Sequence, residues 1–200
     1  AAAASQEIEE FVVKDFSTWY IRRSRERVSL SAEKEDRNTA FSVMYGVLVT
    51  LSKLLAPFTP FIAEEIFRNL TGGESVHLET YPKGDKKLID RELEEEMKQA
   101  RKVVETVHAT RKFHNIKLRQ PLNGFSYSIP KRLRKEIESL IAEETNVKNV
   151  TFELTDSKLE TPFISLDTNL TNELIAEGKA RDIVRQIQEE RKKLGTKLDE

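Results

Sequence analysis

One apolar stretch in an otherwise highly charged chain constrains the fold most: residues 41–70 read FSVMYGVLVTLSKLLAPFTPFIAEEIFRNL. Apolar side chains in its first half recur at the spacing of a single helix face: Phe41, Met44, Tyr45, Leu48, Leu51 and Leu55. Pro57 ends that helix because it lacks an N–H and disfavours the α conformation of the preceding residue. Thr59 and Pro60 predict the start of a second helix, with Thr59 as its N-cap and Pro60 at its first position. Helices joined by so short a linker are neighbours, which predicts a helical bundle.

Further helices and a change of pattern are predicted on either side of this pair. Apolar periodicity predicts a helix over about 6–28 and a long one from about Leu88 or Asp90 to Phe113. The segment 75–82 is expected to be extended. After Pro121 the pattern becomes strand, helix, strand, strand, helix, with expected ranges 125–129, 131–142, 146–154, 162–167 and 170–193. The predicted fold is therefore mainly α: an antiparallel helical bundle in residues 1–120, followed by a small α+β domain in residues 121–200.

Composition narrows the class of protein. The 200 residues are 38% hydrophobic and 34% charged, and charges interrupt the longest apolar run, so we expect neither a membrane span nor a signal peptide. The absence of cysteine excludes disulfides, thiolate zinc sites and cysteine nucleophiles in these residues, which fits a cytoplasmic protein. A net charge of −1 argues against binding to nucleic acid by overall charge, so any such contact must rest on local basic clusters.

Two such clusters stand out. The first, on the end of the 6–28 helix, comprises Arg22, Arg23 and Arg25, and the second, which contains no acid, comprises Arg111, Lys112, Lys117 and Arg119. Cations near a helix C-terminus also complement the helix dipole, so a structural role and a phosphate-binding role both stay open. The second cluster continues past its predicted helix, where dipole complementarity no longer explains it. Arg181, Arg185 and the 191–193 run on the last helix are candidates of lower rank.

Recognisable catalytic chemistry is missing from the sequence. The three histidines form no HExxH pair, and neither GxxxxGK[ST] nor GxGxxG occurs. The carboxylates alternate with Lys and Arg on helical stretches, a pattern typical of solvated charge pairs. We therefore predict no catalytic, cofactor-binding or metal-binding residue in this chain, and folding without zinc.

Five collinear segments carry a family resemblance: WYIRRSR (19–25), LAPFTPFIAEEIF (55–67), SVHLETYP (75–82), KLRQPL (117–122) and the segment 173–195. LAPFTPFIAEEIF resembles the anticodon-binding helical domain of the class I aminoacyl-tRNA synthetases for isoleucine, valine and leucine. WYIRRSR is similar to isoleucyl-tRNA synthetase in particular, and SVHLETYP and KLRQPL continue the resemblance in the same order. The segment 173–195 resembles the C-terminal segment of that enzyme in its archaeal and eukaryotic style. The signatures HxGH and KMSKS, with which that family handles ATP, do not occur, and its editing domain is missing.

The resemblance implies the C-terminal, tRNA-binding part of a larger enzyme, which positions tRNA for ATP-dependent aminoacylation by a catalytic domain outside this chain. The implied partners are tRNA, with isoleucine isoacceptors expected, and the N-terminal catalytic and editing domains; no membrane and no obligate oligomer are implied. ATP and Mg²⁺ would belong to the full-length enzyme. The alternatives are the equivalent valyl or leucyl domain, a helical protein-interaction module that binds no RNA, and a free-standing enzyme, against which the missing motifs argue.

Overall fold

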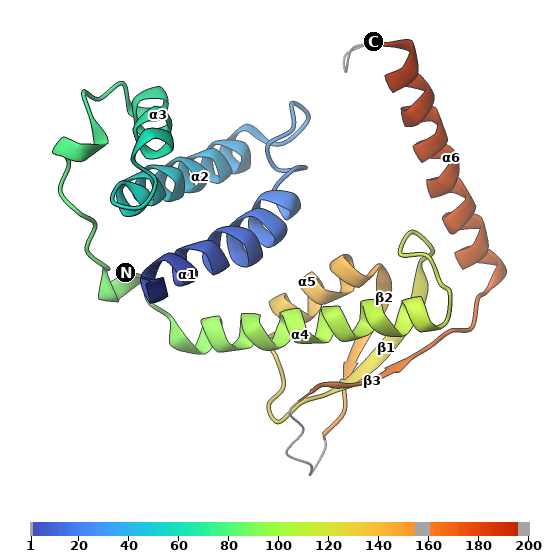
Figure 1. The fold of residues 1–200 in the computed structure, drawn as a ribbon. Coiled ribbons are helices and arrows are strands. Elements are labelled where there is room, and N and C mark those ends of the chain that lie inside the picture. Colours follow the sequence, from blue (N-terminus) through green and yellow to red (C-terminus); the bar gives the residue numbers. More distant parts are fainter. Residues whose placement is uncertain (1, 155–160, 196–200) are drawn as a thin grey trace. The chain divides into compact units, whose positions relative to one another are not determined.

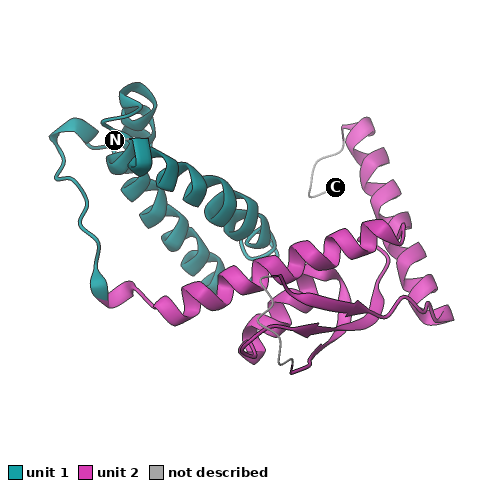
Figure 2. Ribbon diagram, turned by 60° about the horizontal axis from the view of Figure 1, so that its bottom comes forward, with its two compact units in different colours: residues 1–86 teal, residues 87–200 magenta. Residues whose placement is uncertain are grey.

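The computed structural model describes residues 2–154 and 161–195 (Figure 1). It divides into two compact units, residues 1–86 (unit 1) and 87–200 (unit 2), which are coloured separately in Figure 2. Helices dominate the described residues, and a single three-stranded sheet lies in unit 2. The predicted fold class, mainly α with a small α+β part, is confirmed.

Unit 1 begins with one long helical segment that changes its winding. An α-helix, α1 (Ala2–Glu10), continues directly into a π-helix, η1 (Phe11–Ile21). Because a π-helix bonds each residue to the fifth one along, residues five apart lie above one another. Phe11 accordingly stacks on Phe16, with ring centroids 6.2 Å apart, and Phe16 is the buried member of this face. Trp19 is half-buried.

The central helix pair forms as predicted. α2 (Lys34–Leu55) and α3 (Pro60–Thr71) pack on each other, and Pro60 takes the first position of α3. Thr59 is the N-cap residue, but its side chain makes no capping hydrogen bond. The helix ends at Gly72, whose φ of +68° is the left-handed conformation that favours glycine at this position.

The segment after α3 folds back onto it rather than extending freely. Residues 76–78 form a short 3₁₀ helix, η2 (Val76–Leu78), where the sequence predicted an extended run. The backbone N–H of Val76 and the hydroxyl of Ser75 both donate to Oε2 of Glu64, at 2.8 and 3.0 Å. These bonds lower the pKa of Glu64, the Val76 N–H contributing most. Val76 thereby joins the core formed with Ala63 and Phe67.

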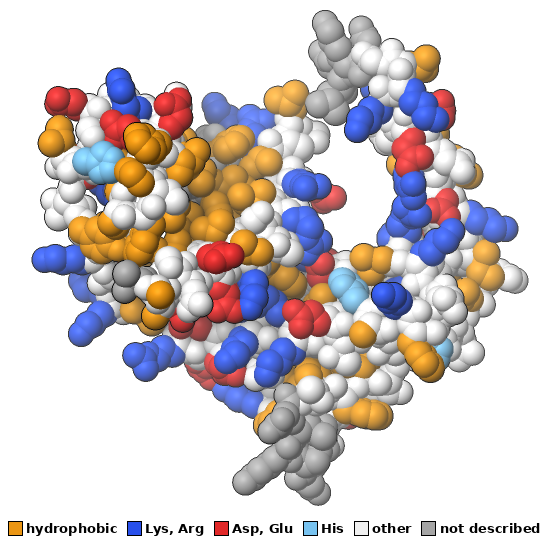
Figure 3. Space-filling view, in the orientation of Figure 1, with side chains coloured by type: hydrophobic (Ala, Val, Ile, Leu, Met, Phe, Trp, Pro, Cys, Tyr) orange, Lys and Arg blue, Asp and Glu red, His pale blue; other side chains and the backbone are white. Residues whose placement is uncertain are grey.

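Two features of α2 go beyond its sequence pattern. By length and composition it is apolar enough to cross a membrane, although we expect no membrane span. Its apolar stripe is also only partly covered, because Leu51 is buried while Phe41 and Tyr45 are half exposed. Figure 3 shows hydrophobic side chains gathered over this part of unit 1. The packing of α2 on α3 and the acids in its first turn are features of a bundle helix.

Unit 2 is a three-stranded sheet packed with helices. Its elements are η3 (Lys86–Leu88, which crosses the junction between the units), α4 (Arg91–Phe113), β1 (Leu122–Ser128), α5 (Lys135–Thr145), β2 (Val147–Phe152), β3 (Phe163–Leu166) and α6 (Asn172–Leu194). The central strand β1 pairs parallel with β2 and antiparallel with β3. Asp90 caps α4 by accepting the N–H of Leu93 at 3.0 Å. α4 contacts α5 and β3, and its buried face holds Ala100, Val103, Val104 and Val107.

The division between the units lies upstream of the predicted domain boundary. The sequence placed that boundary at 120/121, so that α4 belonged to the bundle, whereas the compact units divide between Lys86 and Lys87. The reason is that the apolar face of α4 packs on α5 and β3. A structural unit therefore contains both α4 and the loop that follows it, and this loop carries the second basic cluster.

Candidate nucleic-acid interface

The second basic cluster lies where α4 ends and the chain turns toward β1. The helix stops at Phe113, and Asn115 adopts a left-handed conformation with φ of 57°, which redirects the chain. Residues 112–120, which comprise the last two residues of α4 and the chain that follows toward β1, are together called the α4–β1 loop below. Thr106 to Lys135 contains no acidic residue, so the charge of this loop is purely basic.

Arg111 lies beneath the α4–β1 loop rather than on its surface. Its side chain is 2% exposed. Nη1 donates to the carbonyl oxygens of Lys117 and Gln120, at 3.2 and 2.9 Å, and Nη2 donates to that of Asn146, at 2.9 Å. Burial lowers the pKa of Arg111 to about 10, so the guanidinium stays charged at neutral pH. In this structure Arg111 thus binds three backbone carbonyls and positions the loop, and the phosphate contact that the sequence predicts for it stays a prediction.

Two other side chains fix the same loop. Nδ2 of Asn146 donates to the carbonyl of Leu118 at 2.8 Å, and Nε2 of Gln120 donates to the carbonyl of Leu174 in α6 at 2.8 Å. Gln120 fits there because Gly178 has no Cβ; a Cβ at that position would lie 2.3 Å from Oε1 of Gln120. The sequence analysis missed both residues. The sequence placed Asn146 at the start of the predicted strand 146–154, whereas it is the left-handed residue that ends α5.

The pinned loop presents cations outward. Lys112 and Lys117 are exposed, and neither forms an ion pair with any residue in the described ranges. Both line a depression of about 340 Å³, and its other lining residues are His108, Arg111, Asn115, Ile116 and Leu118. Hydrogen bonds from Arg111 and Asn146 hold the backbone of this loop, so the backbone that carries these two ammonium groups has a fixed position. The arrangement suits a ligand with phosphate oxygens.

The remaining candidates in unit 2 are paired with acids. Arg119 lies 3.0 Å from Asp182, and Arg181 lies 2.7 Å from Glu177. Arg185 pairs with Glu189 along α6. Figure 3 shows Lys and Arg side chains along this helix with acidic ones between them. Such exposed pairs are weak, so a phosphate can compete for these cations, although less readily than for Lys112 and Lys117.

The first basic cluster lies in unit 1, at the end of η1. Nε of Arg22 donates to the carbonyl of Thr18 at 2.9 Å, and the guanidinium of Arg23 lies 5.7 Å from the centroid of the Trp19 ring. Arg25 is exposed. Arg27 is bound by Asp36 in a two-point ion pair, which lowers the pKa of that carboxyl.

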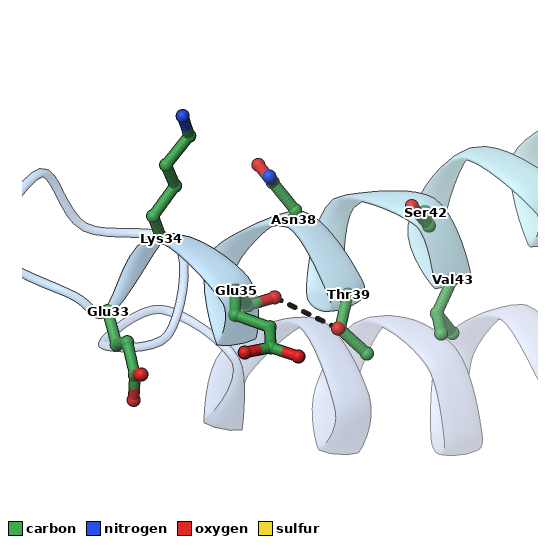
Figure 4. Close-up of a pocket in the computed structure, with 7 residues that line it drawn as sticks. All are labelled: Glu33, Lys34, Glu35, Asn38, Thr39, Ser42 and Val43. Carbon is green, nitrogen blue, oxygen red and sulfur yellow. Dashed lines mark hydrogen bonds between the residues drawn. The ribbon is translucent and has the colours of Figure 1, made fainter.

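Two other features, a depression at the start of α2 and the buried carboxyl of Glu138, are not candidate binding sites. Figure 4 shows a shallow depression at the start of α2, about 620 Å³ in volume, in which Glu33 and Glu35 outnumber the single cation Lys34; an anion is not favoured there. In unit 2, Glu138 is buried, but it accepts hydrogen bonds from Tyr127 at 2.8 Å and from Arg132 at 3.0 Å. Within the described residues, no three potential metal ligands lie together.

Comparison with known proteins defines the class. Residues 2–125 match the family model of the anticodon-binding domain of tRNA ligase. The chain belongs to this family. The match includes unit 1 from residue 2 onward, all of α4 and the α4–β1 loop. It ends close to position 120/121, and the domain boundary predicted there stays a prediction.

Curated relatives of the chain include isoleucine–tRNA ligases. The chain is 37% identical to that of Dehalococcoides mccartyi strain CBDB1, over 94% of this chain and 20% of the relative. It is 44% identical to that of Chlamydia trachomatis serovar D, over 70% and 14%, and 33% identical to that of Pyrococcus abyssi, over 96% and 25%. The chain thus spans a quarter or less of these relatives. The resemblance to the anticodon-binding region of isoleucyl-tRNA synthetase is confirmed.

Proposed function

We propose that this chain binds the anticodon arm of tRNA, and that the α4–β1 loop is its principal phosphate-binding element. One observation carries the proposal: Lys112 and Lys117 stand exposed, without ion pairs among the described residues, on a loop that Arg111 holds from below. Phosphate contacts of this kind fix the register and orientation of a nucleic acid. A rigid basic loop serves that purpose because little conformational freedom is lost on binding.

The other predicted contacts are assigned lower weight. Arg22, Arg23 and Arg25 form a second phosphate-binding group at the end of η1. Arg119, Arg181 and Arg185 contribute after their acidic partners yield to phosphate. Arg111 acts only through the loop. This ranking follows from the ion pairs and the burial described above.

The wider role proposed rests on the relatives' printed names. In a longer protein, this region would hold tRNA while catalytic and editing domains elsewhere in that protein join isoleucine to it with ATP and Mg²⁺, in the cytoplasm. Isoleucine isoacceptors are the proposed substrate. Phosphate contacts carry little base identity, so base-reading groups must add that preference.

Binding of isoleucine, valine and leucine tRNA transcripts, followed by fluorescence anisotropy at several salt concentrations, tests the proposal. We expect salt-dependent binding that is tightest for the isoleucine transcript. Equal affinity for all three would contradict the isoleucine assignment. No binding to any of them, together with recovery of a protein partner in a pull-down, would favour the protein-interaction module instead.

A further inference from the structure

An aromatic side chain at the end of α4 has no structural explanation. Phe113 occupies the last position of the helix and is 81% exposed, although a phenylalanine ring usually gains by burial. Its ring contacts that of His114, at a centroid distance of 5.2 Å with the rings nearly perpendicular. The side chain therefore contributes little to the core of unit 2.

The surroundings of Phe113 fit RNA better than protein. It lies next to Lys112 in the sequence, and the depression lined by Lys112, Asn115, Lys117 and Leu118 adjoins this turn of the helix. Unpaired bases bind proteins by stacking on aromatic rings while nearby cations hold the backbone. A protein partner would need acids opposite these lysines, whereas every nucleotide brings a phosphate together with an aromatic base.

We propose that Phe113 stacks on an unpaired base of the bound RNA while Lys112 and Lys117 hold the adjacent phosphates. This inference rests on the proposed function, because it names the base-contacting residue of the same site. Phe113 would supply contact with a base face, which is present in any nucleotide. It would thus favour single-stranded loop over duplex without choosing the base.

Phe113→Ala tests the inference, with Phe61→Ala as its matched control. Phe61 is 90% exposed on α3, beside the acids Glu64 and Glu65, so the control removes an equally exposed ring from a site without proposed RNA contact. Binding would be measured with an isoleucine anticodon stem-loop carrying 2-aminopurine in its loop, and with a fully paired hairpin. Phe113→Trp preserves a stacking surface and serves as the rescue variant.

We expect Phe113→Ala to weaken binding of the stem-loop about tenfold, with an unchanged salt slope, since no phosphate contact is lost. Quenching of 2-aminopurine on binding should fall with it, and Phe113→Trp should restore both. Phe61→Ala should behave as wild type.

Two outcomes would overturn the inference. In the first, Phe113→Ala binds the stem-loop as wild type does, while Lys112→Ala/Lys117→Ala binds it weakly; the proposed function then stands without the stacking contact. In the second, Phe113→Ala weakens the paired hairpin as much as the stem-loop. If the double lysine variant also binds as wild type, the proposed function fails as well.

Discussion

Replacing Arg111 with alanine is expected to destabilise unit 2 while leaving unit 1 intact. The guanidinium makes hydrogen bonds to three backbone carbonyls, those of Lys117, Gln120 and Asn146. Two of these acceptors keep another donor after the change, because Lys117 O also receives the N–H of Gln120 and Asn146 O that of Leu122. The carbonyl of Gln120 has no other donor among the described contacts.

The magnitude follows from two opposing contributions. Hydrogen bonds from a charged donor contribute about 1.5–3 kcal/mol each. Burial of the charge opposes them, since lowering the pKa of Arg111 to about 10 corresponds to a cost of about 3 kcal/mol. The net loss on replacement by alanine, including the cavity left behind, is therefore roughly 2–6 kcal/mol. Because the pKa of Arg111 stays far above neutral, this loss should be the same at pH 6 and pH 8.

Hydrogen exchange followed by mass spectrometry resolves the effect by unit. In Arg111→Ala, peptides from the α4–β1 loop and β1 should exchange faster, while peptides from α3 should be unchanged. Lys112→Ala, one position away and exposed, is the matched control and should stay within about 0.5 kcal/mol of wild type. A loss below about 1 kcal/mol for Arg111→Ala would refute the reasoning, since at least one stranded carbonyl must cost that much.

Three further outcomes are expected. Below pH about 4, exchange protection of residues 75–78 should fall as Glu64 gains a proton. A carboxyl whose pKa is lowered in the folded state contributes stability above its unfolded pKa of about 4.3 and loses it as the pH falls through the lowered value. Glu64→Gln should lack this acid step, and a step retained in that variant would show another group to be responsible. Chelator treatment should leave the melting temperature unchanged, and a fall of several degrees would reveal a metal site. Purified protein should support no isoleucine-dependent ATP–pyrophosphate exchange, since the sequence carries no phosphate-binding motif; activity above that of a mock preparation would contradict this.

The parts of the fold that depend on local signals were predictable from the sequence. Pro60 at the first position of α3 and Asp90 at the start of α4 act through the backbone of their own turn, and each lies at a predicted position. Strand pairing in unit 2 was not predicted from the sequence. Local chemistry thus determined where α3 and α4 begin.

The parts that depend on distant contacts were not predictable. Arg111 looks in the sequence like any cation at a helix C-terminus. Its burial depends on distant contacts such as the one with the carbonyl of Asn146, 35 residues away. Phe41 and Leu51 belong to one apolar stripe, yet neighbouring elements cover only Leu51. For the same reason the sequence could rank the basic clusters but could not separate the residue that holds the loop from those that the loop presents.

The salt dependence of tRNA binding by Lys112→Ala/Lys117→Ala tests the central claim most directly. Lys83→Ala/Lys86→Ala, which removes two exposed lysines elsewhere, is the control with the same change in net charge. If the α4–β1 loop binds phosphates, the first variant should bind more weakly, and its slope of log K against log salt should be smaller by roughly 1.4–1.8, while the control keeps the wild-type slope. Equal slopes and affinities for both variants and the wild type, in folded protein, would contradict the claim.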